Sequence, residues 1–188
     1  MRVLILDNYD SFTWNLAHGL EAAGAQCTVL RSDSLDLPAV RQLAPDRIVL
    51  SPGPYGPERS GICAQVVREL GGAVPILGVC LGMQVIASVS GASVVPSGRP
   101  CHGRAASVWH DGLGIFNGVP NPFAAARYHS LIVEPASVPP ALLVTARGED
   151  GTILGCRQAG RSVEGVLFHP ESFLTTHSAR LFANFLGV

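Results

Sequence analysis

The sequence predicts an α/β fold: a doubly wound, mostly parallel sheet with an added antiparallel portion, in a single domain over residues 1–188. Three observations carry this prediction. In the first half, short apolar runs alternate with amphipathic segments, which indicates parallel strands joined by crossover helices. Past Gly91 the pattern changes to short extended runs separated by turn pairs. A length of 188 residues suits one domain with a substantial core.

The first half supplies the elements of the expected parallel sheet. An apolar run at 3–6 predicts a strand, and Ser11 is expected to cap a helix whose apolar residues recur at helical spacing until Gly24 ends it. The other elements predicted here are strands at 28–30, 47–50 and 75–79 and helices at 61–70 and 83–89. A parallel sheet of this kind is covered by helices on both faces.

The second half reads as the antiparallel portion. Turn pairs such as Asp111-Gly112, Asn117-Gly118 and Asp150-Gly151 separate its extended runs. These runs lie at 105–109, 128–133, 142–146, 152–156 and 163–168. An apolar helix containing Leu181 and Phe185 is expected to close the chain.

Charge and composition exclude several classes of function. The chain has 13 basic and 14 acidic residues, and every basic residue is Arg. The absence of lysine excludes Schiff-base chemistry and a phosphate-loop lysine. A net charge of −1 argues against nucleic-acid binding, which needs a clustered basic surface. Charged residues make up only 14% of the chain, so the chain is expected either to bury an unusual share of itself or to cover part of its surface with a partner.

The five cysteines indicate a reduced setting, and we expect a cytoplasmic protein. They are odd in number and form no C-x-x-C pair, which disfavours disulfide, zinc and thioredoxin-like sites. The uncharged stretch 73–98 is long enough to cross a bilayer, but its Pro, Gly and Ser residues divide it into a strand and a helix. No membrane span is therefore expected, and the N-terminal apolar run is too short for a signal peptide.

A nucleophile motif, Gly78-Val79-Cys80-Leu81-Gly82, lies where a buried strand should turn into a helix. The glycines allow a tight turn that would expose the Cys80 thiol at the C-terminal edge of the sheet. The start of the following helix favours a thiolate there, and the Leu81 N–H could donate to an oxyanion. Taken alone, the motif could equally be a core cysteine between two glycines.

His169 and Glu171 are the expected partners of Cys80. Pro170 biases His169 towards an extended conformation, in which residues two apart point to the same side. Glu171 could then orient one imidazole nitrogen while the other faces Cys80, as in a Cys–His–Glu triad. Alone, His-Pro-Glu could be a surface turn.

A third motif, 51–57, follows the predicted strand 47–50 and should lie at the same sheet edge. Gly53 is fixed between two prolines and offers a rigid N–H as a second oxyanion donor. An ordinary Pro/Gly surface loop is the alternative.

Five motifs together resemble class I (triad) glutamine amidotransferases, and among them the glutaminase component, component II, of anthranilate synthase and aminodeoxychorismate synthase. In this sequence the motifs are Asp7-Asn8-Tyr9-Asp10-Ser11-Phe12-Thr13, Ser51-Pro52-Gly53-Pro54, Gly78-Val79-Cys80-Leu81-Gly82, Arg127-Tyr128-His129-Ser130-Leu131 and Phe168-His169-Pro170-Glu171-Ser172. They span essentially the whole chain, and the resemblance implies a flavodoxin-like amidotransferase fold.

The resemblance also implies an activity. Cys80 would attack the side-chain amide of L-glutamine, His169 would shuttle protons, and Glu171 would orient His169. The amides of Gly53 and Leu81 would hold the oxyanion. The implied substrate-binding residues are Gly53, Pro54, Tyr55, Gln84, Ser130 and Leu131. Ammonia would pass to a separate chorismate-utilising synthase subunit that carries Mg²⁺, while this chain would hold no metal or cofactor.

The sequence departs from the family pattern at several positions. Tyr55 stands where the family usually has Gly, so its side chain could narrow the site, change the loop or point outward. Arg104 replaces a usual Lys, and neighbouring His102 is expected to be structural or partner-facing. Two alternatives stay open: a non-catalytic or regulatory subunit that only docks a synthase, and a free-standing cysteine hydrolase. His110 and His177 have no ligand-spaced partners, so no metal site is expected.

Overall fold

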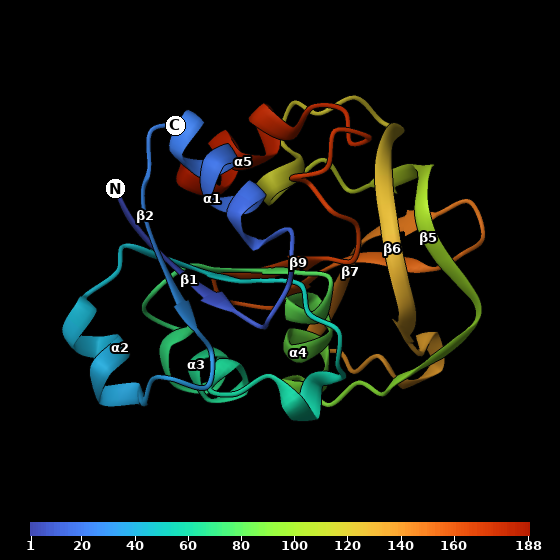
Figure 1. Ribbon diagram of the computed structural model, residues 1–188. Coiled ribbons are helices and arrows are strands. Elements are labelled where there is room, and N and C mark those ends of the chain that lie inside the picture. The colour runs from blue at the N-terminus through green and yellow to red at the C-terminus, as the bar shows by residue number, and fades with distance from the viewer.

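Nine strands form one mixed sheet in the order β2-β1-β3-β4-β9-β8-β7-β5-β6 in the computed structural model, which describes residues 1–188 (Figure 1). The parallel half consists of β1 (Arg2–Asp7), β2 (Gln26–Arg31), β3 (Arg47–Leu50), β4 (Ile76–Val79) and β9 (Val163–Val166). The antiparallel half consists of β8 (Ile153–Gln158), β7 (Leu142–Gly148), β5 (Val94–His110) and β6 (Phe123–Val133). This arrangement confirms the predicted fold class.

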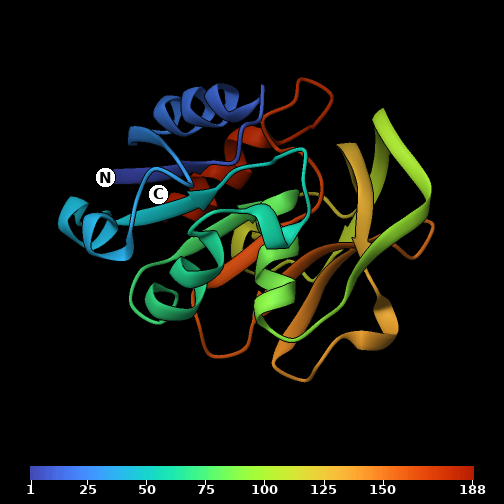
Figure 2. The same ribbon diagram turned by 60° about the horizontal axis from the view of Figure 1, so that its bottom comes forward.

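Helices cover both faces of the parallel half. On one face lie α1 (Thr13–Ala22) and α5 (Ser178–Leu186), and on the other lie α2 (Leu37–Leu43), α3 (Cys63–Leu70) and α4 (Leu81–Val89) (Figures 1 and 2). All four residues of β4 are buried, as expected for a central strand whose sequence is continuously apolar. Short 3₁₀ turns at Pro57–Arg59, Gly114–Phe116 and Pro135–Ser137 complete the connections.

Several element boundaries differ from the sequence-based expectation. Helix α2 was not expected, although Asp36 caps it through the Ala39 N–H at 2.9 Å and a proline stands in its first turn. Strand β5 runs for 17 residues, far beyond the expected 105–109, because its polar N-terminal part pairs with β6 across bulges. Helix α4 begins at Leu81 rather than 83, and β9 ends at Val166 rather than 168.

The expected Ser11 cap of α1 is wrong. Phe12 occupies the N-cap position and forms no side-chain cap. Two acidic residues accept hydrogen bonds at this end of the helix instead. Asp10 accepts from the backbone N–H of Phe12 at 2.8 Å, and Asp7 accepts from the side-chain hydroxyl of Thr13 at 2.9 Å. Asp7 is further paired with Arg31 at 2.6 Å, so the C-terminal end of β1 is tied to α1 and β2.

No helix of this protein is both long enough and apolar enough to cross a membrane. The uncharged stretch 73–98 instead contains β4 and the nine-residue helix α4, as the sequence indicated.

The turn between β4 and α4 depends on two close backbone approaches. A Cβ on Gly78 would collide with the backbone of Gly82, and a Cβ on Gly82 would collide with the carbonyl oxygen of Leu50 in β3. Both neighbours are backbone atoms of buried elements and cannot move aside easily. Glycine is therefore required at both positions for α4 to pack onto the sheet.

Replacing Gly82 by Ala should lower the free energy of unfolding by about 1–3 kcal/mol, since the added methyl group must displace Leu50. Urea unfolding of both proteins measures the difference. Gly72→Ala is the matched control, because a Cβ there meets only the Arg161 side chain at ordinary contact distance, 3.6 Å. A Gly82→Ala protein as stable as the control would contradict the packing argument.

Candidate active site at the C-terminal edge of the parallel sheet

Cys80 occupies a strained turn between β4 and α4. Its φ of 52° and ψ of −102° lie outside the regions that non-glycine residues ordinarily adopt. Its N–H donates to the Val166 carbonyl of β9 at 2.8 Å, which anchors the turn to the neighbouring strand. The residue is buried, and its sulfur lies 3.8 Å from the Tyr128 carbonyl oxygen. The predicted elbow is thus present. Cys80 differs from an ordinary core cysteine in its strained backbone conformation.

His169 and Glu171 form a buried pair beside this turn. Nδ1 of His169 lies 2.6 Å from Oε1 of Glu171, as the same-side argument predicted. The imidazole ring packs edge-on against Tyr128 and Phe12, with centroid separations of 5.1 and 5.9 Å. Its backbone N–H donates to Ala126 of β6 at 2.9 Å. These contacts fix the orientation of the ring.

The electrostatic surroundings favour a positively charged His169. Burial is the largest influence and by itself lowers its pKa, but the Cys80 sulfur and the Glu171 carboxylate, through hydrogen bonding and charge, raise the pKa of His169 from 6.5 to about 10. The second ring nitrogen, Nε2, is buried and has no partner that meets full hydrogen-bond geometry. It is therefore available for a proton shared with the Cys80 sulfur or with a bound substrate.

A cavity of about 430 Å³ lies in front of Cys80. The predicted residues that line it are Gly53, Pro54, Tyr55, Cys80, Gln84, Ser130 and Leu131. The Gln84 side-chain amide donates to the Leu131 carbonyl at 3.3 Å, which joins α4 to β6 across the cavity. His169 and Glu171 lie behind the lining, so Cys80 is the member of the expected triad that lines the cavity.

Two backbone N–H groups are available near the thiol. Leu81 is the first residue of α4, so its N–H has no intrahelical acceptor. The N–H of Gly53 donates to no protein atom. A Cβ on Gly53 would lie 2.6 Å from the Leu81 side chain and 2.8 Å from Asn8, which shows how closely the loop packs onto the elbow.

The Asp7–Asn8 segment supports this loop. The Asn8 N–H donates to the Ser51 hydroxyl at 2.8 Å, and the Asn8 side-chain amide donates to the Ser51 carbonyl at 3.0 Å. The first motif of the sequence therefore acts on the site by holding the backbone that leads into Gly53.

Sequence reasoning missed five residues that line the cavity: Asp10, Gly56, His102, Tyr128 and His129. The expectation for His102 was incomplete, since its Nε2 lies 3.1 Å from the Ser130 hydroxyl within the cavity wall. His129 accepts from Arg127 at 3.0 Å, and burial together with the Arg127 charge lowers its pKa to about 4. Membership in one motif with Ser130 was the signal that could have identified Tyr128 and His129.

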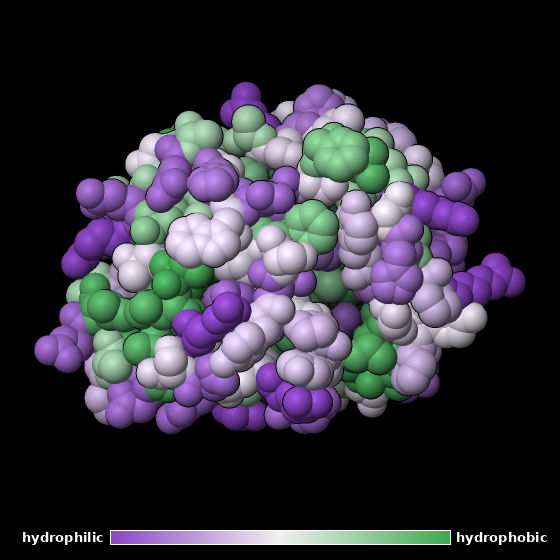
Figure 3. All heavy atoms as spheres, in the orientation of Figure 1, coloured by the Kyte–Doolittle hydropathy of each residue, from purple (hydrophilic) through white to green (hydrophobic).

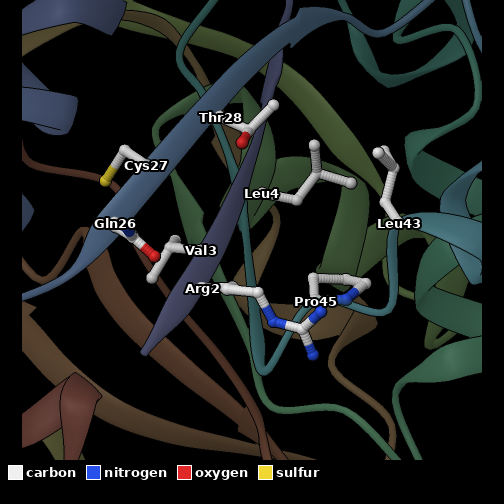
Figure 4. Close-up of a pocket in the computed structure, with 8 residues that line it drawn as sticks. All are labelled: Arg2, Val3, Leu4, Gln26, Cys27, Thr28, Leu43 and Pro45. Atoms are coloured by element: carbon white, nitrogen blue, oxygen red, sulfur yellow. The ribbon is translucent and has the colours of Figure 1, made fainter.

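Other candidate groups lie outside this arrangement. His110 stacks on Phe116 with centroids 4.7 Å apart, and no group of three or more His, Cys, Asp or Glu residues is arranged to hold a metal ion. Another hollow, of about 320 Å³, is lined by residues at the starts of β1 and β2 (Figure 4). In a parallel sheet this is the edge opposite Cys80, and no histidine lines it to activate Cys27.

The comparisons with known proteins agree with this geometry. The sequence model of the family "Glutamine amidotransferase class-I" matches residues 4–187. The chain is 48% identical to aminodeoxychorismate synthase component 2 of Klebsiella aerogenes, covering 98% of this chain and 99% of the relative. It is 45% identical to anthranilate synthase component 2 of Azospirillum brasilense, covering 98% and 95%. The Bacillus subtilis aminodeoxychorismate/anthranilate synthase component 2 is 43% identical, again over 98% and 95%.

A solved structure shares the fold. A Thermoplasma acidophilum protein described as a GMP synthase subunit superposes with a TM-score of 0.88 at 24% sequence identity, over 100% of this chain and 92% of the other. The matched family model covers nearly the whole sequence, and four of the five motifs that suggested the resemblance contribute residues to one cavity. The chain is a member of the class I glutamine amidotransferase family.

Proposed function

We propose that this protein hydrolyses L-glutamine through a γ-glutamyl thioester on Cys80 and delivers the ammonia to a synthase subunit that aminates chorismate. One observation carries the proposal: the strained, buried Cys80 lines a cavity, and the His169–Glu171 pair is buried close enough to it for the Cys80 sulfur to raise the pKa of His169. The family membership and the names of the relatives support it.

The first half-reaction forms the thioester. The Cys80 thiolate attacks the side-chain carbonyl carbon of glutamine, and the carbonyl oxygen becomes an oxyanion that the Leu81 and Gly53 N–H groups stabilise. The imidazolium of His169 gives its proton to the departing amine, and the C–N bond breaks. Ammonia leaves, and a thioester remains on Cys80.

The second half-reaction reverses the proton transfer. His169, now neutral, accepts a proton from water as the water attacks the thioester carbonyl. The tetrahedral intermediate collapses, the C–S bond breaks, and glutamate leaves with the thiolate restored. Glu171 holds the ring in the required tautomer throughout by accepting from Nδ1.

The cavity wall supplies groups for the polar atoms of glutamine. In the proposal, Gln84 and the Ser130–Leu131 segment bind these atoms, and Pro54 and Tyr55 form the rim above them. The placement of all five in the lining supports this assignment. The hydrogen bond between Gln84 and Leu131 holds α4 and β6 together in this part of the wall.

The synthase partner is proposed from the relatives and from the surface. Trp14 is 60% exposed and Phe173 is 92% exposed, and each lies two residues from a group that contacts His169. The face shown in Figure 3 has separate hydrophobic areas among hydrophilic residues. Exposed aromatic residues of this kind are enriched at interfaces. The proposal places any Mg²⁺ on the partner and the protein in the cytoplasm, where a free catalytic thiol stays reduced.

A non-catalytic docking subunit is the alternative from the sequence, and Tyr55, in place of the usual Gly of the family, is the one feature of the sequence that favours it. The Tyr55 ring is 41% exposed and stacks on Arg59, with the guanidinium carbon 3.7 Å from the ring centroid. The side chain therefore leaves the cavity in front of Cys80 open, which supports the catalytic proposal.

Cys80→Ser should abolish glutaminase activity, measured as glutamate release by the purified chain alone and with its co-purified synthase. Cys27→Ser is the matched control, because Cys27 lies at the opposite sheet edge and burial raises the pKa of its thiol to about 11. Product analysis with chorismate identifies the aminated compound. Absence of activity with the partner present, or full activity of Cys80→Ser, would contradict the proposal. Turnover of other amides by the chain without a partner would indicate a free-standing hydrolase instead.

Glu171→Gln should lower kcat at least about 10²-fold and shift the alkaline limb of the kcat/KM profile to lower pH. The sign follows because Glu171 raises the pKa of His169, so its loss lets the imidazolium deprotonate earlier as pH rises. Steady-state kinetics over the neutral to alkaline range measure both effects. Glu69→Gln, on the exposed side of α3, is the control. An alkaline limb in the same place in both variants would remove Glu171 from the mechanism.

A further inference from the structure

Tyr55 forms a wall between two hollows. On one side it lines the cavity in front of Cys80. On the other side it lines a second hollow of about 420 Å³, together with Tyr9, Ser32, Asp33, Arg59 and Gly61. Tyr55 is 41% exposed, and the two hollows give open space on either side of it.

Arg59 makes the one specific contact of the Tyr55 side chain. Its guanidinium carbon lies 3.7 Å from the ring centroid, and it forms no salt bridge or side-chain hydrogen bond elsewhere. The Tyr55 hydroxyl likewise has no hydrogen-bond partner in the protein. The stack therefore determines which of the two hollows the ring faces.

The backbone of this loop does little to hold Tyr55 in place. Pro52, Pro54 and Pro57 have no N–H, and the N–H groups of Gly53, Tyr55 and Gly56 donate to no protein atom. Gly53 is packed against the elbow, but the hydrogen bonds of the chain beyond it begin at Gly56, which accepts from the Arg59 N–H at 3.0 Å, and at Pro57, which accepts from the Ser60 hydroxyl at 2.7 Å. Release of the ring from Arg59 would let it turn towards the cavity.

We propose that Arg59 is a positioning residue that keeps the Tyr55 ring out of the cavity in front of Cys80, and so sets the affinity for glutamine. The inference rests on the proposed function, because it takes glutamine as the occupant of that cavity. A ring turned inward would occupy the space of the substrate and compete with it. Arg59 should therefore matter only in a protein that has a bulky residue at position 55.

A double-mutant cycle tests this dependence. Arg59→Ala should raise KM for glutamine about two- to fivefold with kcat unchanged, the range that a cation–π contact at an exposed site supports. In a Tyr55→Gly background the same change should have no effect on KM. Arg59→Lys should restore part of the loss, and Arg180→Ala, which removes a positive charge from an exposed position, should match the wild type.

A second readout does not need glutamine. The rate at which iodoacetamide alkylates Cys80, followed on the Cys80-containing peptide by mass spectrometry, should fall in Arg59→Ala and recover in the double variant with Tyr55→Gly. An unchanged alkylation rate in Arg59→Ala, or an equal fall with and without Tyr55, would overturn the inference. Failure of the proposed function would appear separately, as wild-type protein that is alkylated normally but releases no glutamate.

Discussion

The strained backbone at Cys80 is the constraint on which the site depends. It exists because Gly78 and Gly82 let α4 approach the sheet so closely that the chain must reverse within one residue. That reversal places the sulfur at the cavity and leaves the Leu81 N–H at the start of a helix, where the proposed mechanism needs a donor for the oxyanion. A positive φ at a non-glycine residue costs free energy, and the fully buried strand β4, with the largely buried β3 and β9 beside it, supplies the packing that maintains it.

The pairing of β9 with β4 brings His169 and Glu171 to this turn. Strand β9 pairs with β4 in parallel, with Val166 opposite Val79, and the Val166 carbonyl accepts from the Cys80 N–H. The chain then leads directly to His169 and Glu171. Residues 94–158 form the antiparallel half of the sheet, which includes β6. Tyr128 of β6 packs on His169, and Ser130 and Leu131 of the same strand line the cavity. The antiparallel portion is therefore a wall of the site as well as an extension of the sheet.

The sequence alone predicted the parallel half and the elbow, because both are encoded in local patterns: apolar runs, glycine spacing and a proline beside His169. The full length of β5 was missed because its polar N-terminal part pairs with β6 across bulges. Pairing of this kind leaves no periodic pattern in the sequence of the strand itself. The cavity roles of His102 and His129 depend on pairing between those same strands. The outward position of Tyr55 depends on Arg59, a contact that the residue types permit but do not require. What the sequence could not predict is mainly side-chain placement set by long-range packing.

The central claim is that Cys80 forms a covalent intermediate with glutamine, and trapping that intermediate tests it most directly. The chain, with its synthase partner present, is mixed with glutamine, quenched in acid within the first turnovers and digested for mass spectrometry. The account predicts one γ-glutamyl group on the peptide that contains Cys80 and none on the peptides that contain the other four cysteines. Glutamate release without any adduct on Cys80, or with an adduct on a different cysteine, would contradict it.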